Sequence, residues 1–77
     1  AVAKLMHNYA AVLDQLGDWM LASGMGEEAG PYLYDAVRIL TFHGEDEWAR
    51  RILSRWEEHA GGREGKLLER ARRLARE

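Results

Sequence analysis

Glycines divide this 77-residue chain into four stretches of helical periodicity, and this division limits what the chain can fold into. Gly24 and Gly26 interrupt the apolar pattern once, Gly44 interrupts it again, and Gly61 and Gly62 do so a third time. Glycine adopts positive φ without steric cost, so it commonly ends helices. β-branched residues are few and do not alternate with polar ones, which disfavours strands. The chain is therefore predicted to be all-α, with four short antiparallel helices arranged as two helical hairpins.

The first predicted hairpin spans 2–40. Its first helix runs from about Val2 to about Ser23, with apolar residues in steps of four and three, which is typical of an amphipathic helix. This stripe comprises Leu5, Tyr9, Val12, Leu16 and Trp19, and Leu13 and Met20 widen it. The second helix is expected to begin near 28–30, because Pro31 suits only the first turn of a helix. It is expected to end before Gly44.

The second helix carries two tyrosines on different faces. Tyr32 shares an apolar face with Leu33, Ala36, Val37 and Leu40. Tyr34 lies off this face, beside Asp35 and Arg38, and is expected to be the more exposed of the two. Phe42 belongs to the connector 41–44 and is expected to tuck under the junction of the hairpins.

The second predicted hairpin spans 45–76. Its first helix opens with the acids Glu45 to Glu47, which suit the positive end of a helix dipole. The apolar stripe of that helix comprises Trp48, Ile52, Leu53 and Trp56, and Gly61 and Gly62 end it. The last helix places Leu67, Leu68, Ala71, Leu74 and Ala75 on one face. Connections this short favour antiparallel neighbours.

Composition narrows the class of protein. The chain is 47% hydrophobic and 31% charged, so a single globular domain over 1–77 is expected. It has no cysteine, which excludes disulfides and Cys-ligated metal sites. No apolar run is long enough to span a membrane, and residues 1–10 lack a signal-peptide pattern. A cytoplasmic protein without membrane contact is therefore expected.

Charge is distributed unevenly. The net charge of −2 argues against nucleic acid as a partner. Residues 1–43 carry two basic and five acidic side chains, a net of −3, whereas residues 63–77 carry six basic and three acidic side chains, a net of +3. This asymmetry favours an acidic partner for the last helix, or attraction between two copies.

Small and large residues alternate at set spacings within residues 10–43. The positions are Leu13, Leu16, Gly17, Gly24, Glu28, Ala29, Pro31, Tyr32, Ala36, Val37 and Ile39. This pattern resembles one tetratricopeptide repeat (TPR), a 34-residue helix–turn–helix unit. Gly17 and Ala29 are small enough for two helices to approach closely, with the bulky Leu16 and Tyr32 beside them. The resemblance implies that a peptide or a partner helix binds in a concave face, without catalysis.

Residues 45–77 depart from the repeat. Counting 34 residues on from Gly17 and Ala29 gives Arg51 and Arg63, which replace the small residues. The second hairpin is therefore interpreted as a degenerate or unrelated unit. Because repeat arrays normally need three units, the chain is interpreted as a capping piece, a fragment of a longer array, or a self-assembling chain. A homodimer is favoured over a monomer, since the first helix has more apolar surface than one hairpin layer buries.

Signatures of catalysis are missing from the sequence. His7, His43 and His59 form neither His-x3-His nor His-Glu-x-x-His, and they are interpreted as surface or loop residues. Adjacent carboxylates such as 27–28 and 57–58 point apart on a helix, unlike a general acid–base pair. The segment 24–26 lacks the Lys-Ser/Thr that follows a phosphate loop. The chain is predicted not to be an enzyme and to hold no metal or cofactor.

Five residues are the candidates for binding a partner. Trp48 and Trp56 lie on one helix face, and tryptophan is enriched at binding hot spots, although core packing is its commoner role. Tyr34 is a candidate because it is expected to be exposed. Arg70 and Arg73 belong to a basic face of the last helix, where interleaved glutamates favour a solvated, ion-paired surface over phosphate contacts.

The sequence thus predicts a protein–protein interaction or assembly module that binds a protein or peptide. The alternative is a small DNA-binding or transcription-regulatory helical protein, whose basic last helix would contact the DNA backbone. Binding that weakens steeply with added salt would distinguish this alternative.

Overall fold

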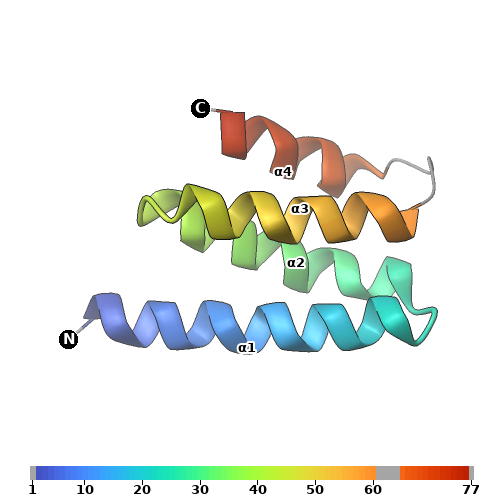
Figure 1. The fold of residues 1–77 in the computed structure, drawn as a ribbon, viewed down its shortest axis with the longest axis horizontal. Coiled ribbons are helices and arrows are strands. Elements are labelled where there is room, and N and C mark those ends of the chain that lie inside the picture. The colour runs from blue at the N-terminus through green and yellow to red at the C-terminus, as the bar shows by residue number, and fades with distance from the viewer. Residues whose placement is uncertain (1, 61–64, 77) are drawn as a thin grey trace.

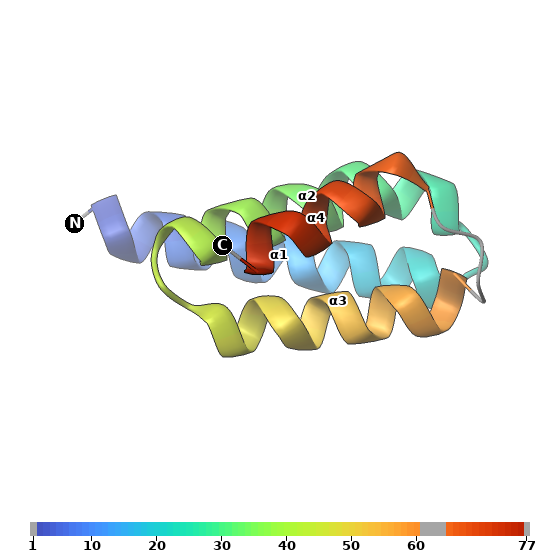
Figure 2. The ribbon, with the colours of Figure 1, turned by 90° about the horizontal axis from the view of Figure 1, so that it is seen from above.

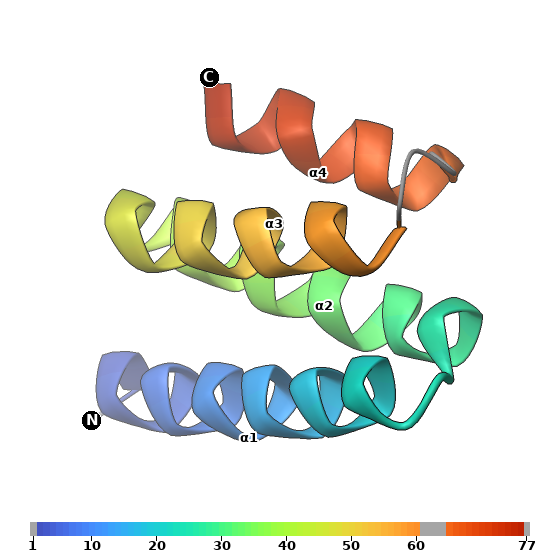
Figure 3. The same ribbon diagram turned by 45° about the vertical axis from the view of Figure 1, so that its right-hand side comes forward.

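The computed structural model describes residues 2–60 and 65–76, and four helices make up most of this part of the chain. They are α1 (Val2–Ala22), α2 (Gly26–Phe42), α3 (Asp46–Ala60) and α4 (Lys66–Arg76). No strand occurs within the described residues, so the all-α prediction is confirmed. Figures 1 and 3 show α1 along one edge of the molecule and α4 along the opposite edge. Seen from above in Figure 2, α4 lies over α2, with α3 alongside.

One glycine turn reverses the chain after α1, and a second does so after α2. Gly24 has a φ of 77°, its N–H donates to the carbonyl of Leu21 (3.2 Å), and the N–H of Met25 donates to the carbonyl of Met20 (2.8 Å). The same two bonds recur after α2, from Gly44 (φ 78°) and the residue that follows it, at 3.1 and 2.7 Å. This is the Schellman arrangement, which favours glycine at its left-handed position. The predicted stops at both glycines are confirmed, whereas the stop at 61–62 lies outside the described residues.

α2 begins at Gly26 and carries Pro31 inside it, so the predicted start at 28–30 was wrong. Pro31 lacks the N–H that would bond to the carbonyl of Glu27. Both residues are exposed, so water can reach that carbonyl in place of the missing donor. The helix therefore tolerates the proline beyond its first turn.

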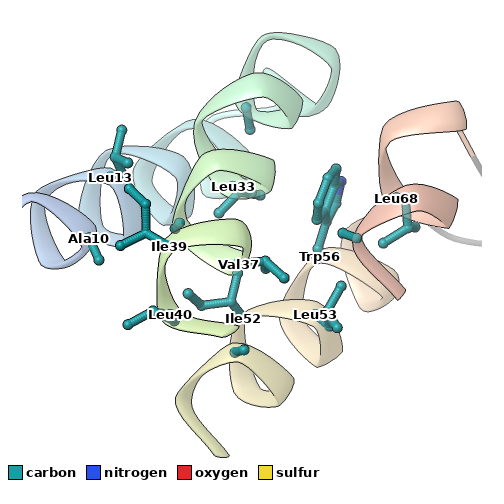
Figure 4. Packing of buried hydrophobic residues seen from close by; sticks show 14 of the residues in the cluster. Ala10, Leu13, Leu33, Val37, Ile39, Leu40, Ile52, Leu53, Trp56 and Leu68 are labelled. Atoms are coloured by element: carbon teal, nitrogen blue, oxygen red, sulfur yellow. The ribbon is translucent and has the colours of Figure 1, made fainter. Parts of the chain in front are cut away.

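The core is built around α2, which packs against each of the other three helices. The largest fully buried side chains are Leu33, Leu40, Ile52, Leu68 and Val37. Three of them belong to α2, with one each from α3 and α4. Figure 4 shows Leu33 and Val37 on α2, between Leu13 on α1 and Trp56 on α3. The side chains of α2 thus connect the two edges of the molecule.

Gly17 sets how closely α1 and α2 approach. A Cβ at this position would lie 2.4 Å from Cδ2 and 2.7 Å from Cγ of Leu33, far inside normal contact. Leu33 can therefore pack against α1 because position 17 has no side chain. The close approach predicted at Gly17 is confirmed, and the small residue Ala29 is fully buried. Tyr32 does not fill the space beside Gly17, because it is exposed and Leu33 takes that place.

Candidate functional site

The predicted apolar stripe of α1 faces solvent. Leu5, Val12 and Trp19 are 67%, 60% and 60% exposed, Tyr9 is 48% exposed, and Leu16 is partly buried. We call these five residues the α1 stripe. They follow one another in steps of four and three, so they form one continuous line along the helix. This line holds four of the six large hydrophobic residues that are exposed in the described part of the chain.

A second apolar face of α1 enters the core instead. It comprises Ala10, Leu13, Gly17 and Leu21, all buried. This face contains the small residues Ala10 and Gly17, which allow α2 to approach closely, whereas the stripe presents two bulky aromatic side chains. Steric fit between helices therefore selects the face that is buried and leaves the larger side chains outside.

The α1 stripe has a counterpart on α3 that is already covered. When α1 and α3 are aligned with an offset of 36 residues, the buried residues Leu13 and Gly17 of α1 coincide with the buried residues Ala49 and Leu53 of α3. The shift relates Val12 to Trp48, Leu16 to Ile52 and Trp19 to Arg55. Ile52 is fully buried, and Trp48 and Arg55 both contact Asp14 of α1. On α3, then, this face packs against the preceding helices.

The same shift also preserves the face that each helix turns toward its following partner. Gly17 contacts Leu33 of α2, and the residue 36 positions later, Leu53, lines a groove between α3 and α4 together with Arg72 and Ala75. The face of α1 that carries the exposed stripe therefore corresponds to the face of α3 that packs against the preceding helices.

A polar seam joins α1 to α3. The indole Nε1 of Trp48 donates to Oδ2 of Asp14 at 2.9 Å, and Arg55 donates to the other oxygen of the same carboxylate. Nη1 of Arg55 also lies 2.9 Å from Oδ1 of Asp18. We call these four residues the α1–α3 seam. Because both oxygens of Asp14 accept hydrogen bonds from α3, the seam holds the two helices in register.

His7 extends the contact between α1 and α3. Its Nε2 lies 3.4 Å from Oε1 of Glu45, and its ring lies 5.4 Å from that of Trp48, centroid to centroid. His7, His43 and His59 are all exposed, so the prediction of surface histidines is confirmed. Among residues 2–60 and 65–76, no group of three or more His, Asp or Glu side chains could hold a metal ion.

The five predicted partner-binding residues do not lie together. Trp48 is partly buried in the seam, while Trp56 is buried against the core, next to Leu68 in Figure 4. Arg70 and Arg73 are exposed on α4, and Nη2 of Arg73 donates to Oε1 of Glu69 at 2.8 Å. This contact agrees with the ion-paired surface that the interleaved glutamates predicted. Trp48 and Trp56 thus contribute to folding contacts, and the arginines belong to a separate surface.

Two expectations about aromatic residues were wrong. Tyr34 packs against the core, and Tyr32 is the more exposed of the two tyrosines on α2. The reason is that Tyr34 lies one turn from Gly30, on the side of α2 that meets α4, where a Cβ on Gly30 would lie 3.4 Å from Cδ1 of Leu67. Phe42 does not tuck under a junction, because it forms the last residue of α2 and is 85% exposed.

A cleft of about 750 Å³ opens where the start of α2 faces α3 and α4. Its lining includes the backbone of Gly24, Gly26 and Gly30 together with the apolar side chains Trp56 and Leu68. The glycines account for the hollow, because they present no side chains to fill it. Glu27 and Glu28 also line it and are exposed. Since adjacent helix residues point apart, these carboxylates do not form a convergent pair.

Compared with protein-family models, curated proteins and solved structures, the chain matches none. Within the described residues, no helix has both the length and the apolar character needed to cross a bilayer.

Proposed function

We propose that this chain is a TPR-like protein-interaction module, without catalytic activity, that binds a helical protein partner through the α1 stripe. The observation that carries the proposal is the exposure of Leu5, Tyr9, Val12 and Trp19 in one line on one helix. Single exposed apolar residues are ordinary, but a contiguous apolar surface marks an interaction site. Tryptophan and tyrosine supply much of the binding energy at such sites.

The chain itself supports a helical partner. On α3, the equivalent face is covered by α1 and α2, and Ile52 at its centre is fully buried. A helix, or a pair of helices, laid along the α1 stripe would cover it in the same manner. Recognition of this kind places an apolar helix face into a groove or against another helix, with anchors spaced by three and four residues.

Three features support the TPR-like part of the proposal. Gly17 and Leu33 pack without a gap, the two glycine turns close with the same bonds, and the second helix pair packs on the first through the equivalent face of its leading helix. In repeat proteins each unit contacts mainly its neighbours. A cytoplasmic location belongs to the same proposal, since a chain without cysteine is suited to a reducing compartment.

The proposal is tested by site-specific photo-crosslinking in cells that express the full chain. A photoreactive phenylalanine analogue replaces Val12 in one variant and Ser54 in a control, because both are exposed helix positions but only Val12 belongs to the stripe. We expect protein adducts from position 12, identified by mass spectrometry, and few from position 54. Equal adduct yields at the two positions would overturn the proposed binding face.

A further inference from the structure

We infer that the partner on the α1 stripe is a second copy of this chain, docked as an antiparallel pair of α1 helices. The inference rests on the proposed function and adds the identity of the partner. It makes the interface self-complementary, because each copy contributes the same residues about a two-fold axis.

The spacing of the stripe matches that of the core positions of a coiled coil. Leu5, Val12 and Trp19 recur every seven residues, and Tyr9 and Leu16 fill the alternate positions of the heptads. Core positions of this kind pack against those of an identical helix by knobs-into-holes packing. A helix with this pattern is therefore matched to another copy of itself.

The flanks of the stripe do not repel a second copy. On one side of it, the neighbouring positions hold Asn8 and Gln15, which are polar and uncharged. On the other side they hold Met6, Leu13 and Met20. Because like charges at flanking positions would destabilise a self-pair, an uncharged border favours pairing between identical helices.

The helix dipoles favour the antiparallel direction, because a parallel pair would place the two N-terminal ends side by side and the two C-terminal ends side by side. Asp14 and Asp18 do not contribute to this preference, because they lie in the α1–α3 seam, on another face of α1.

Head-to-tail stacking of copies is disfavoured by the surface of α4. Burying this surface against an apolar stripe would require desolvation of the exposed charge of Arg70 and of the exposed Arg73–Glu69 ion pair. Pairing through α1 leaves α4 in water. The assembly is thus closed at two copies.

The available area fits a weak, reversible dimer. From the exposed fractions of its side chains, the stripe offers on the order of 500 Å² per copy, given about 150–250 Å² for each large aromatic side chain. Two copies would bury about 1,000 Å², the lower end for a specific interface. We therefore expect dimerisation in the micromolar range.

The first test is sedimentation of the full chain at concentrations that span the micromolar range. The mass should rise from 8.8 kDa to twice that value. The variant Val12→Glu should weaken dimerisation at least ten-fold, because it buries a charge between the two α1 helices. The control Ser54→Glu adds the same charge outside the stripe and should dimerise like the parent. Far-UV circular dichroism checks that both variants remain helical, as expected for exposed positions.

The second test uses the absence of cysteine to report direction and register. In the antiparallel pair, Leu5 of one copy lies opposite Leu16 of the other, while the two copies of Leu5 lie about 16 Å apart, too far for a disulfide. Mild oxidation should link Leu5→Cys to Leu16→Cys in a mixture of the two variants. Leu5→Cys alone should give little linked dimer. The reverse result would overturn the antiparallel arrangement.

The two proposals fail in different ways. A parent chain that stays at 8.8 kDa throughout, or a Val12→Glu variant that dimerises normally, overturns the second copy as the partner. If position 12 nevertheless crosslinks to a different protein, the interaction module stands. If the parent chain does not dimerise and position 12 gives no more adducts than position 54, both proposals fail.

Discussion

At the residue scale, Gly17 decides which side of α1 is buried. The helix carries apolar side chains on two faces, but only the face with Gly17 lets Leu33 come into contact with the α1 backbone. The α1 stripe, which has the larger side chains, therefore remains exposed to solvent. Hydrophobicity alone does not distinguish two apolar faces, whereas the volume of the residues does.

The substitution Gly17→Ala is expected to lower the free energy of unfolding by about 1–2 kcal/mol. Overpacking at a buried site costs about 1–3 kcal/mol, which exceeds the gain of about 1 kcal/mol in helix propensity. Urea denaturation followed by circular dichroism measures the difference, below the concentration at which dimers form.

Gly26→Ala is the matched control for this substitution, because a Cβ at position 26 meets nothing within 4 Å. It should be neutral or stabilising. The clash also predicts that Gly17→Ala becomes stabilising once Leu33→Ala has removed the obstructing side chain. A Gly17→Ala chain that is as stable as the parent would contradict the close packing.

Sequence reasoning at this scale succeeded where a residue acts through its own backbone. Gly24 and Gly44 were identified as helix stops, because a left-handed residue ends a helix whatever surrounds it. It failed for Tyr32 and Tyr34, whose exposure depends on where α1 and α4 lie around α2. Trp48 was recognised as a large aromatic residue, but its hydrogen bond to Asp14 spans 34 residues and leaves no local signal.

At the scale of elements, the α1–α3 seam fixes how the second helix pair sits on the first. Asp14 lies between Trp48 and Arg55, and its side chain is largely buried, at 17% exposure. Charge-assisted hydrogen bonds are directional, so they fix the relative position of two helices. Apolar contacts are not directional and do not fix it. The exposed side of α1 is set by the same geometry, because the seam and the stripe lie on different faces of that helix.

Asp14→Ala should lower the free energy of unfolding by about 1–2 kcal/mol relative to Asp35→Ala, as measured by urea denaturation. Asp14 accepts hydrogen bonds from two α3 side chains in a partly buried site. Asp35 pairs with Arg38 at an exposed position within α2, where an ion pair contributes about 0–1 kcal/mol. Both changes are Asp to Ala within a helix, so the gain in propensity cancels between them. Equal stabilities would show that the seam contributes nothing.

The boundaries of the helices were predicted well from capping chemistry, with one exception. α2 starts earlier than Pro31 suggested, because an exposed carbonyl can bond to water when a donor is missing. The second helix pair departs from the first in sequence. Its apolar faces were readable from periodicity, but the shift of 36 residues that aligns it with the first pair differs from the 34 residues of the repeat pattern.

At the scale of the whole molecule, the central position of α2 predicts that the chain unfolds as a single cooperative unit. Leu40 is fully buried, and its helix contacts all the others. Leu40→Ala is expected to cost about 2–5 kcal/mol. Because α1 and α3 both lose support, circular dichroism and tryptophan fluorescence should report one shared denaturation midpoint, shifted to lower urea.

Phe42→Ala is the matched control on the same helix. Its side chain is 85% exposed, so its removal should change stability by less than about 0.5 kcal/mol. Two separate midpoints in the Leu40→Ala chain, with α3 surviving the loss of α1, would contradict a single cooperative unit.

The two glycine turns have a consequence for how such a chain can change over evolutionary time. Each reversal is closed by main-chain bonds around one left-handed glycine, so it makes few demands on neighbouring side chains. Duplicating or deleting a stretch from one glycine to the next would carry a complete connection with it. Length could then vary in whole-helix steps without a new loop having to arise, while selection acted on the helix faces alone.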